Sequence, residues 1–224
     1  ALQTGAANDP KELQAGMVAY AALAALQEPK FAAAVRNAPA ATLRRMATDP
    51  QAAMSLPGAE AAAARASGAL YAQGTSLNTE GQKVKKAAYS IQKQSWSKAK
   101  VPNAAGRLAL VQEISAAGYQ PAAGDAADLQ TALRGSGPRS GGASVLVMLG
   151  LALAARASSG QPARSPVSAP RTGMCLRMAK LNLYQCLASA GPHYEDVYCL
   201  GQHAMMETAR CVTDATTPRR TQIA

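Results

Sequence analysis

MCLRMAKLNLYQCLASAGPHYEDVYCLGQHAMMETARCVTD, residues 174–214, contains all four cysteines of this 224-residue chain. The run before Gly191 lacks Pro and Gly and has a composition that favours helix. Gly191-Pro192 is a stop signal, because Gly adopts the left-handed conformation that ends helices and Pro cannot continue one. A second helical run covers roughly Glu195–Thr213. The stretch therefore predicts two antiparallel helices joined by a short turn.

The cysteine spacing predicts cross-links between these helices. Cys175 and Cys186 are eleven positions apart, which at ~100° per residue is about 20° from whole turns, so they share a face. Cys199 and Cys211 are twelve apart, about 120° out of register, so the second helix needs an irregular turn or a frayed end. Four cysteines allow three pairings. The short turn favours the nested one, Cys186–Cys199 beside the turn and Cys175–Cys211 at the open end.

In outline, the stretch resembles the twin-cysteine hairpins of the coiled-coil-helix-coiled-coil-helix kind, with wider cysteine spacing. The resemblance covers only this part of the chain and implies architecture alone.

A metal site is the alternative reading of the same residues. Zinc ligands usually include a Cys-x-x-Cys pair, and the chain has none. Cys199, His203 and Met206 follow i, i+4, i+7 spacing, with Met205 adjacent, and thiolate, imidazole and thioether together suit copper(I). The competing interpretation is that His203 lies at the edge of the core and the methionines pack.

The composition favours an all-α fold in an exported protein. Hydrophobic residues make up 48% of the chain but aromatic residues only 4%, and the abundant alanine favours closely packed helices over a β-sandwich. The chain starts at Ala1 without a leader-like segment, which together with the predicted disulfides suggests a mature protein whose signal peptide has been removed. Its Ala, Arg, Gly and Pro usage is typical of a GC-rich bacterium. We expect a periplasmic or secreted, cell-envelope location.

The net charge of +10 is unevenly distributed. Between Leu129 and Tyr194 there is no acidic residue, against seven basic ones. Such a surplus favours an anionic partner through long-range attraction, whether an acidic protein or lipid head groups. Nucleic acid is not an expected partner of an exported protein.

Four parts of the chain are expected. Residues 1–137 form an irregular, alanine-rich helical bundle, with Asp9 capping a first helix from Pro10 and short helices beginning near Pro29, Pro39 and Pro50. Residues 143–156 are a hydrophobic helix, too short to span a bilayer, that packs in the bundle or contacts a membrane or partner. Residues 157–173 are a Pro/Ser-rich linker, and residues 174–214 are the cysteine hairpin.

Two longer helices are expected inside the bundle. One runs from Pro57 to about Ala72. The other starts at Glu80, with Thr79 and Gln82 as a capping box, and ends near Ala99. The second helix is basic, and four of its lysines form a candidate binding face: Lys83, Lys86, Lys93 and Lys100. The competing interpretation is an ordinary solvated face, with Tyr89 and Trp96 holding the helix on the bundle.

The chain lacks the usual catalytic motifs. No Gly-x-Ser-x-Gly, His-Glu-x-x-His or phosphate-binding glycine loop is present. His193, Tyr194, Glu195 and Asp196 gather acid–base groups at the turn of the hairpin, although the same residues also make a good helix N-terminus. We therefore expect a non-enzymatic protein, without a cofactor, that binds or scaffolds another envelope component. The alternatives are a copper-handling protein using the hairpin and a cell-wall hydrolase with a site near His193 and Glu195.

Overall fold

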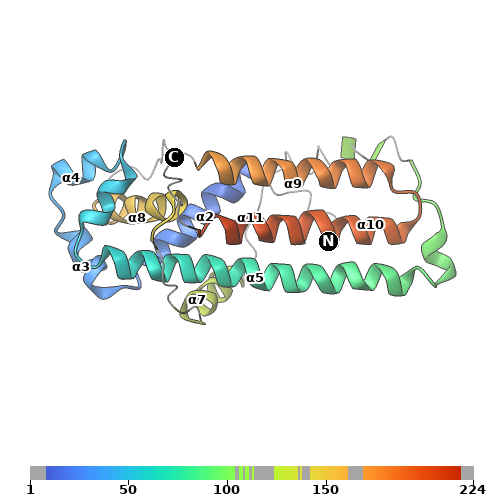
Figure 1. Cartoon of the computed structure of the whole chain (residues 1–224), viewed down its shortest axis with the longest axis horizontal. Helices are drawn as coiled ribbons and strands as arrows, with labels where there is room; N and C mark the ends of the chain where they lie inside the picture. Colours follow the sequence, from blue (N-terminus) through green and yellow to red (C-terminus); the bar gives the residue numbers. More distant parts are fainter. Residues whose placement is uncertain are drawn as a thin grey trace, which may run out of the picture. The chain divides into compact units, whose positions relative to one another are not determined.

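The structure, a computed structural model, describes residues 9–103, 106–107, 109–110, 113, 124–135, 137, 142–160 and 169–217 (Figure 1). These residues are mostly helical and contain no β-strand, which confirms the predicted all-α class. The helices are α2 (Pro10–Ala25), α3 (Pro29–Arg36), α4 (Ala40–Arg45), η1 (Pro50–Ser55), α5 (Ala59–Ile91), η2 (Ser95–Lys98), α7 (Asp125–Gly135), α8 (Val145–Ser158), α9 (Pro170–Ser189), α10 (His193–Cys199), η3 (Leu200–Glu207) and α11 (Thr208–Asp214).

The helix starts near the N-terminus follow the predicted Asp and Pro signals. The Asp9 carboxylate accepts a hydrogen bond from the Lys11 backbone N–H at 2.7 Å, so it caps α2. α3 begins at Pro29. Ahead of η1, the Asp49 carboxylate accepts from the Gln51 backbone N–H at 3.2 Å. Local sequence therefore determines where these helices begin.

α5 is one helix of 33 residues, and the predicted break between Ala72 and Glu80 is wrong. The Thr79 hydroxyl, expected to cap a second helix, donates to the Thr75 carbonyl oxygen at 3.0 Å and so completes a bond within the helix. No Pro interrupts this region, and a Gly costs a helix only about 1 kcal/mol relative to Ala. α5 ends at Ile91, well before the predicted end, and η2 follows as a short 3₁₀ helix.

The described residues form two compact units that differ from the predicted domains. Unit 1 contains the described residues of 9–13, 74–113 and 173–211, so the hairpin shares it with the second half of α5 and η2. Unit 2 contains those of 14–73, 124–172 and 212–217. The predicted linker is also shorter at both ends, because α8 extends to Ser158 and α9 already begins at Pro170. Its other prolines, Pro162 and Pro166, lie outside the described residues.

The core of unit 2 is built around α8. This helix packs against η1, α3 and α4, and it buries eight of its residues. A Cβ on Gly150 would lie 2.6 Å from the Ala21 Cβ and 3.1 Å from the Ala22 backbone nitrogen, so the glycine permits close approach of α2. The hydrophobic helix is thus buried in unit 2, which is one of the two alternatives that the sequence left open. Among the described residues, no helix has both the length and the apolar character needed to cross a membrane.

Several predicted segments fall wholly or partly outside the described residues. Residues 104–117 are described only at five positions, which are helical, and the Asn103 side chain accepts from the Gly106 backbone N–H at 3.0 Å. Within the same part of the chain, α7 is described from Asp125 to Gly135. Most of the glycine-rich segment after α7 and the chain beyond residue 217 lie outside the description.

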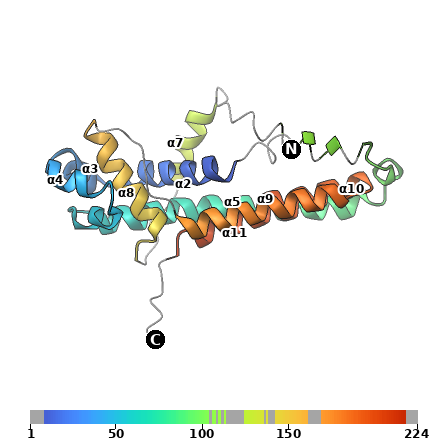
Figure 2. The same ribbon diagram turned by 90° about the horizontal axis from the view of Figure 1, so that it is seen from above.

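In unit 1, three helical segments lie side by side in one layer (Figures 1 and 2). The continuous helix formed by α10, η3 and α11 lies between α9 and the second half of α5. α9 and α10 follow each other through the predicted turn at Gly191-Pro192. This layer carries every residue of the predicted hairpin sites.

Candidate interaction surface of the disulfide hairpin

The hairpin is cross-linked twice, in the nested arrangement that the short turn favours. Cys186 is bonded to Cys199 beside the turn and Cys175 to Cys211 at the open end, with a Cα–Cα distance of 5.6 Å in both. All four cysteines are used. Because disulfides persist in oxidising environments, they indicate an oxidising, non-cytoplasmic compartment.

The irregular turn required between Cys199 and Cys211 is a π-helical segment, η3 (Leu200–Glu207). π-helical bonds join residues five apart rather than four, so such a segment accommodates one extra residue within an α-helix. If that extra residue is not counted, the two cysteines are effectively eleven positions apart and not twelve. Eleven positions correspond to a rotation about 20° from whole turns. The same offset separates Cys175 from Cys186 on α9. The π-helical segment therefore brings both pairs into register.

Two glycines let η3 approach α5 closely. A Cβ on Gly201 would lie 2.6 Å from the backbone nitrogen of Lys85 and 2.9 Å from its Cα, while a Cβ on Gly81 would lie 2.8 Å from Met206 Cγ and 2.9 Å from Met205 Cβ. Backbone atoms cannot move aside as flexible side chains can, so the Gly201 contact fixes the separation of the two helices.

The inner face of the hairpin is apolar. Its buried cluster contains Leu183 and Leu187 of α9, Ala190, Cys199 and Leu200. The inner disulfide is part of this cluster, with Cys199 only 1% exposed. Burial of the leucines, worth about 1.5–3 kcal/mol each, therefore acts together with the cross-link at the turn.

A polar network centred on Glu207 connects the three helical segments. Its carboxylate accepts hydrogen bonds from Asn182 of α9 at 2.9 Å, from His203 Nδ1 at 2.9 Å and from Gln202 at 3.5 Å. The Gln202 amide oxygen accepts in turn from Lys85 of α5 at 2.8 Å. All five side chains are partly buried, so the network adds polar specificity to the apolar packing.

The residues predicted as alternative copper ligands are engaged in other contacts. Cys199 is in a disulfide and offers no thiolate. His203 bonds Glu207, whereas Met206 packs against Gly81 of α5. Within the part of the chain that the structure describes, no group of three or more His, Cys, Asp or Glu side chains could hold a metal ion.

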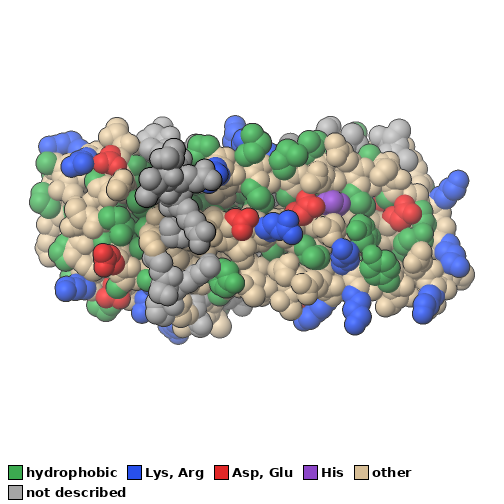
Figure 3. Space-filling view, viewed as in Figure 1, with side chains coloured by type: hydrophobic (Ala, Val, Ile, Leu, Met, Phe, Trp, Pro, Cys, Tyr) green, Lys and Arg blue, Asp and Glu red, His purple; other side chains and the backbone are tan. Residues whose placement is uncertain are grey.

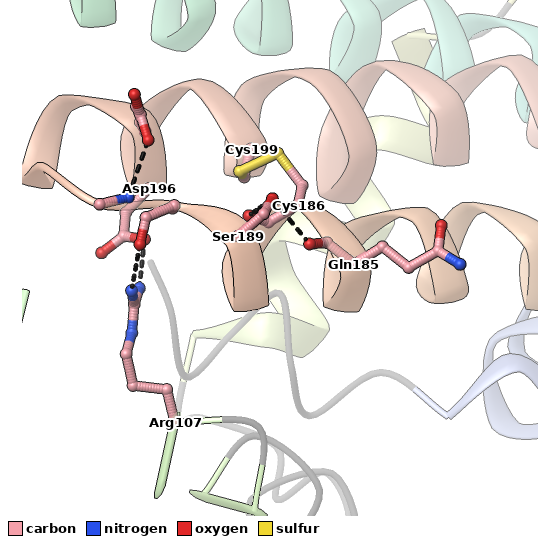
Figure 4. Close-up of polar contacts among 9 residues, drawn as sticks. Arg107, Gln185, Cys186, Ser189, Asp196 and Cys199 are labelled. Atoms are coloured by element: carbon pink, nitrogen blue, oxygen red, sulfur yellow. Dashed lines mark hydrogen bonds and ion pairs between the residues drawn. A yellow bond between two sulfur atoms is a disulfide. The ribbon is translucent and has the colours of Figure 1, made fainter. Parts of the chain in front are cut away.

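The acid–base residues at the turn hold the turn itself (Figure 4). Glu195 accepts from the Gly191 backbone N–H at 2.8 Å. Asp196 is buried and forms an ion pair with Arg107, which also donates to the Ala190 carbonyl oxygen at 3.4 Å. Both carboxylates that a hydrolase site would need are therefore engaged in structural bonds.

The outer face of α9 carries an exposed apolar stripe that the sequence analysis missed. Met174 is 54% exposed, and Met178 and Leu181 are 46% exposed each, at i, i+4 and i+7. We call these three residues the α9 stripe. Figure 3 shows hydrophobic side chains along the edge of the molecule formed by α9. Steps of 100° per residue place the stripe about 100° from the two cysteines and roughly opposite the buried Leu183 and Leu187, so the spacing of these leucines could have revealed it.

The four predicted basic residues are exposed but do not form one helix face. Lys83 and Lys86 lie on α5, whereas Lys93 and Lys100 follow its end, so the predicted stripe is wrong as a helical feature. Lys83 forms an ion pair with Glu80 at 2.7 Å. The partly buried Lys85 instead faces the hairpin, with Nζ 5.1 Å from the centre of the Tyr198 ring.

No protein-family model, curated protein or solved structure matches the chain significantly.

Proposed function

We propose that the protein is a non-enzymatic binding protein of the cell envelope, periplasmic or secreted, that holds another envelope protein on the α9 stripe. The observation that supports this is the exposure of Met174, Met178 and Leu181 on a helix whose opposite face is buried. Apolar side chains grouped on an exposed face are typical of interaction sites. Methionine suits such a site, because its flexible thioether adapts to the partner's shape.

The two disulfides pre-organise this surface. Cys175 lies next to the first stripe residue and Cys186 lies five positions after the last, and both are bonded to the neighbouring helix. α9 is therefore held at both ends while its outer face stays uncovered. Ordering a flexible binding segment on association costs conformational entropy. A helix that is already cross-linked has less conformational entropy to lose when it binds.

The stripe fits an amphipathic helix of the partner. Spacing of i, i+4 and i+7 places the three side chains on one ridge, which packs into the groove of a facing helix. α9 has no acidic residue and carries exposed Arg177 beside the stripe. The partner helix should accordingly carry acidic residues flanking its apolar face, because opposite charges favour encounter and orientation.

Site-specific photo-cross-linking tests the proposal in the cells that make the protein. A benzophenone amino acid placed at 178 or 181 should form a discrete adduct with another envelope protein. The same probe at Gln82, an exposed position of α5, should not form it. Leu181→Glu should abolish the adduct formed from 178, while the control Gln82→Glu should leave it unchanged.

Two results would contradict the proposal. One is the absence of an adduct from both stripe positions in protein whose mass shows both disulfides intact. The other is an adduct with a second copy of the chain, which would make the stripe a self-association surface. Measuring the mass of the free protein by light scattering separates these two cases.

A further inference from the structure

The chain's single tryptophan is exposed at the end of unit 1, where η2 follows α5, and lysines flank it in the sequence. Trp96 lies in η2 and is 60% exposed, the highest value among the large hydrophobic residues that the structure describes. Lys93, Lys98 and Lys100 precede and follow it and are all exposed. We call these four residues the Trp96 tip. Figure 3 shows Lys and Arg side chains projecting at this end of unit 1.

The conformation of η2 forces Trp96 outward. Ser97 is completely buried, and its hydroxyl lies 2.5 Å from the Ile91 carbonyl oxygen and 2.8 Å from that of Gln94. A 3₁₀ helix turns by about 120° per residue, so Trp96 cannot share the inward direction of Ser97. The exposed indole thus follows from a well-bonded turn.

The segment after η2 is fastened to the disulfide hairpin. The Val101 backbone N–H donates to the Gly191 carbonyl oxygen at 2.8 Å, and the His193 N–H donates to the Ala99 carbonyl oxygen at 3.3 Å. η2 also packs against α10. The Trp96 tip is therefore held on the cross-linked part of unit 1, and its aromatic side chain is displayed by a fixed backbone.

The sequence around Trp96 carries charge of one sign. The sequence from Gly81 to Gln112 contains six lysines and one arginine but no acidic residue. Some of these charges have partners elsewhere, as Arg107 has in Asp196. In the described part of the chain, Lys93, Lys98 and Lys100 form no ion pair. The exposed indole is thus flanked along the chain by three lysines without an ion pair among the described residues, while Glu195 and Asp196 of the neighbouring α10 bond to Gly191 and Arg107.

We propose that the Trp96 tip docks the protein on an anionic lipid bilayer surface. Indole rings are well suited to the bilayer interface, because their apolar body enters the acyl boundary while the N–H stays among the head groups. Lysine side chains extend their ammonium groups to lipid phosphates. The disulfides favour lipid over nucleic acid as the anionic ligand, since they indicate a non-cytoplasmic compartment.

The proposal concerns a different surface from the α9 stripe, so the two can fail separately. Membrane docking needs no helix insertion; a basic surface with one interfacial aromatic residue binds reversibly from one side. Each lysine near an anionic bilayer should contribute about fivefold to the partition coefficient. Loss of all three should lower it by about two orders of magnitude.

Vesicle binding of the full-length, disulfide-intact chain tests this proposal directly. Because Trp96 is the only tryptophan, its emission reports the docking residue itself. Vesicles of phosphatidylglycerol and phosphatidylcholine in equal parts should shift the emission to shorter wavelength, and brominated acyl chains should quench it. Pure phosphatidylcholine vesicles should do neither, and 0.5 M salt should weaken binding.

Variants distinguish the Trp96 tip from general attraction of a basic chain. Lys98→Gln should lower the partition coefficient about fivefold, while Lys30→Gln, an exposed lysine of unit 2 with the same charge change, should leave it unchanged. Trp96→Phe, followed by sedimentation with vesicles, should retain more binding than Trp96→Ser.

The proposal is overturned if anionic vesicles leave the emission unchanged, or if Lys30→Gln weakens binding as much as Lys98→Gln. It is also overturned if a single-stranded oligonucleotide at the same salt concentration binds the Trp96 tip more tightly than the vesicles do. Leu181→Glu should not change vesicle binding, which keeps this result independent of partner binding by α9.

Discussion

From the π-helical segment η3 we predict that one residue can be deleted there without loss of either disulfide, which is unusual for a helix. Removing one residue from an α-helix normally rotates everything beyond it by about 100°. Deleting Ala204, inside η3, should instead convert the π-helical segment into regular α-helix, because that segment already contains one residue too many. Cys199 and Cys211 would then be eleven positions apart and remain about 20° from whole turns. Both disulfides should still form.

Deleting Leu181 of α9 is the matched control. Its side chain is exposed, so the loss of the residue itself removes little packing. The deletion leaves ten positions between Cys175 and Cys186, about 80° short of three turns, and α9 has no π-helical segment to compensate. One disulfide should therefore fail. The bridges close separations of 36 and 13 residues, and the loop-entropy relation values them at about 3.8 and about 2.9 kcal/mol.

Intact mass after thiol alkylation in denaturant, without reduction, measures the outcome. The Ala204 deletion should show no alkylated cysteine and the native pairing by peptide mapping. The Leu181 deletion should show two alkylated cysteines and a free energy of unfolding lower by about 3 kcal/mol or more. If the two variants had equal numbers of free thiols, η3 would not be what brings Cys199 and Cys211 into register with the cysteines of α9.

Two further predictions concern packing and charge in unit 1, the first with a control glycine in unit 2. Gly201→Ala should lower the free energy of unfolding by about 1–2 kcal/mol, because overpacking against the α5 backbone costs about 1–3 kcal/mol and exceeds the gain in helix propensity. Gly16 has open space around it, so Gly16→Ala should raise the free energy of unfolding by up to about 1 kcal/mol. In urea unfolding followed by circular dichroism, the midpoint should fall for Gly201→Ala and rise for Gly16→Ala. Asp196→Asn should destabilise unit 1 by about 3 kcal/mol, because the guanidinium of Arg107, with a side chain only 13% exposed, then lacks its counter-charge. Circular dichroism during denaturation checks this, and an unchanged midpoint would show that the pair is not structural.

Local signals predicted helix starts better than helix continuity. Asp9 and Asp49 cap their helices because an Asp before a Pro offers a side-chain acceptor and a fixed backbone angle, both of which act within a few residues. Thr79 carries the same kind of signal but lies inside α5, where its hydroxyl bonds to Thr75 instead. A capping pattern predicts a helix start only where the chain actually breaks, and packing of the helix decides whether it does.

The candidate site was predictable only in part. The cysteine residues marked the hairpin, and the acidic residues at its turn could be read as either catalytic or structural. Their partners decide this: Arg107 lies far along the chain from Asp196, and no local pattern connects the two. The α9 stripe and the exposure of Trp96 likewise depend on which faces other helices leave uncovered.

By itself the sequence determined the helical class, the position of the hairpin turn and the need for an irregular turn between Cys199 and Cys211. These depend on composition, on Gly and Pro, and on counting residues along a helix of known twist. Only the tertiary structure decided that this turn is η3, that the second half of α5 completes the hairpin's unit, and that Met174, Met178 and Leu181 on α9 are exposed. The physical reason is that contacts such as Gly201 with the backbone of Lys85 join residues far apart in the chain, and their steric fit is not encoded in local propensity.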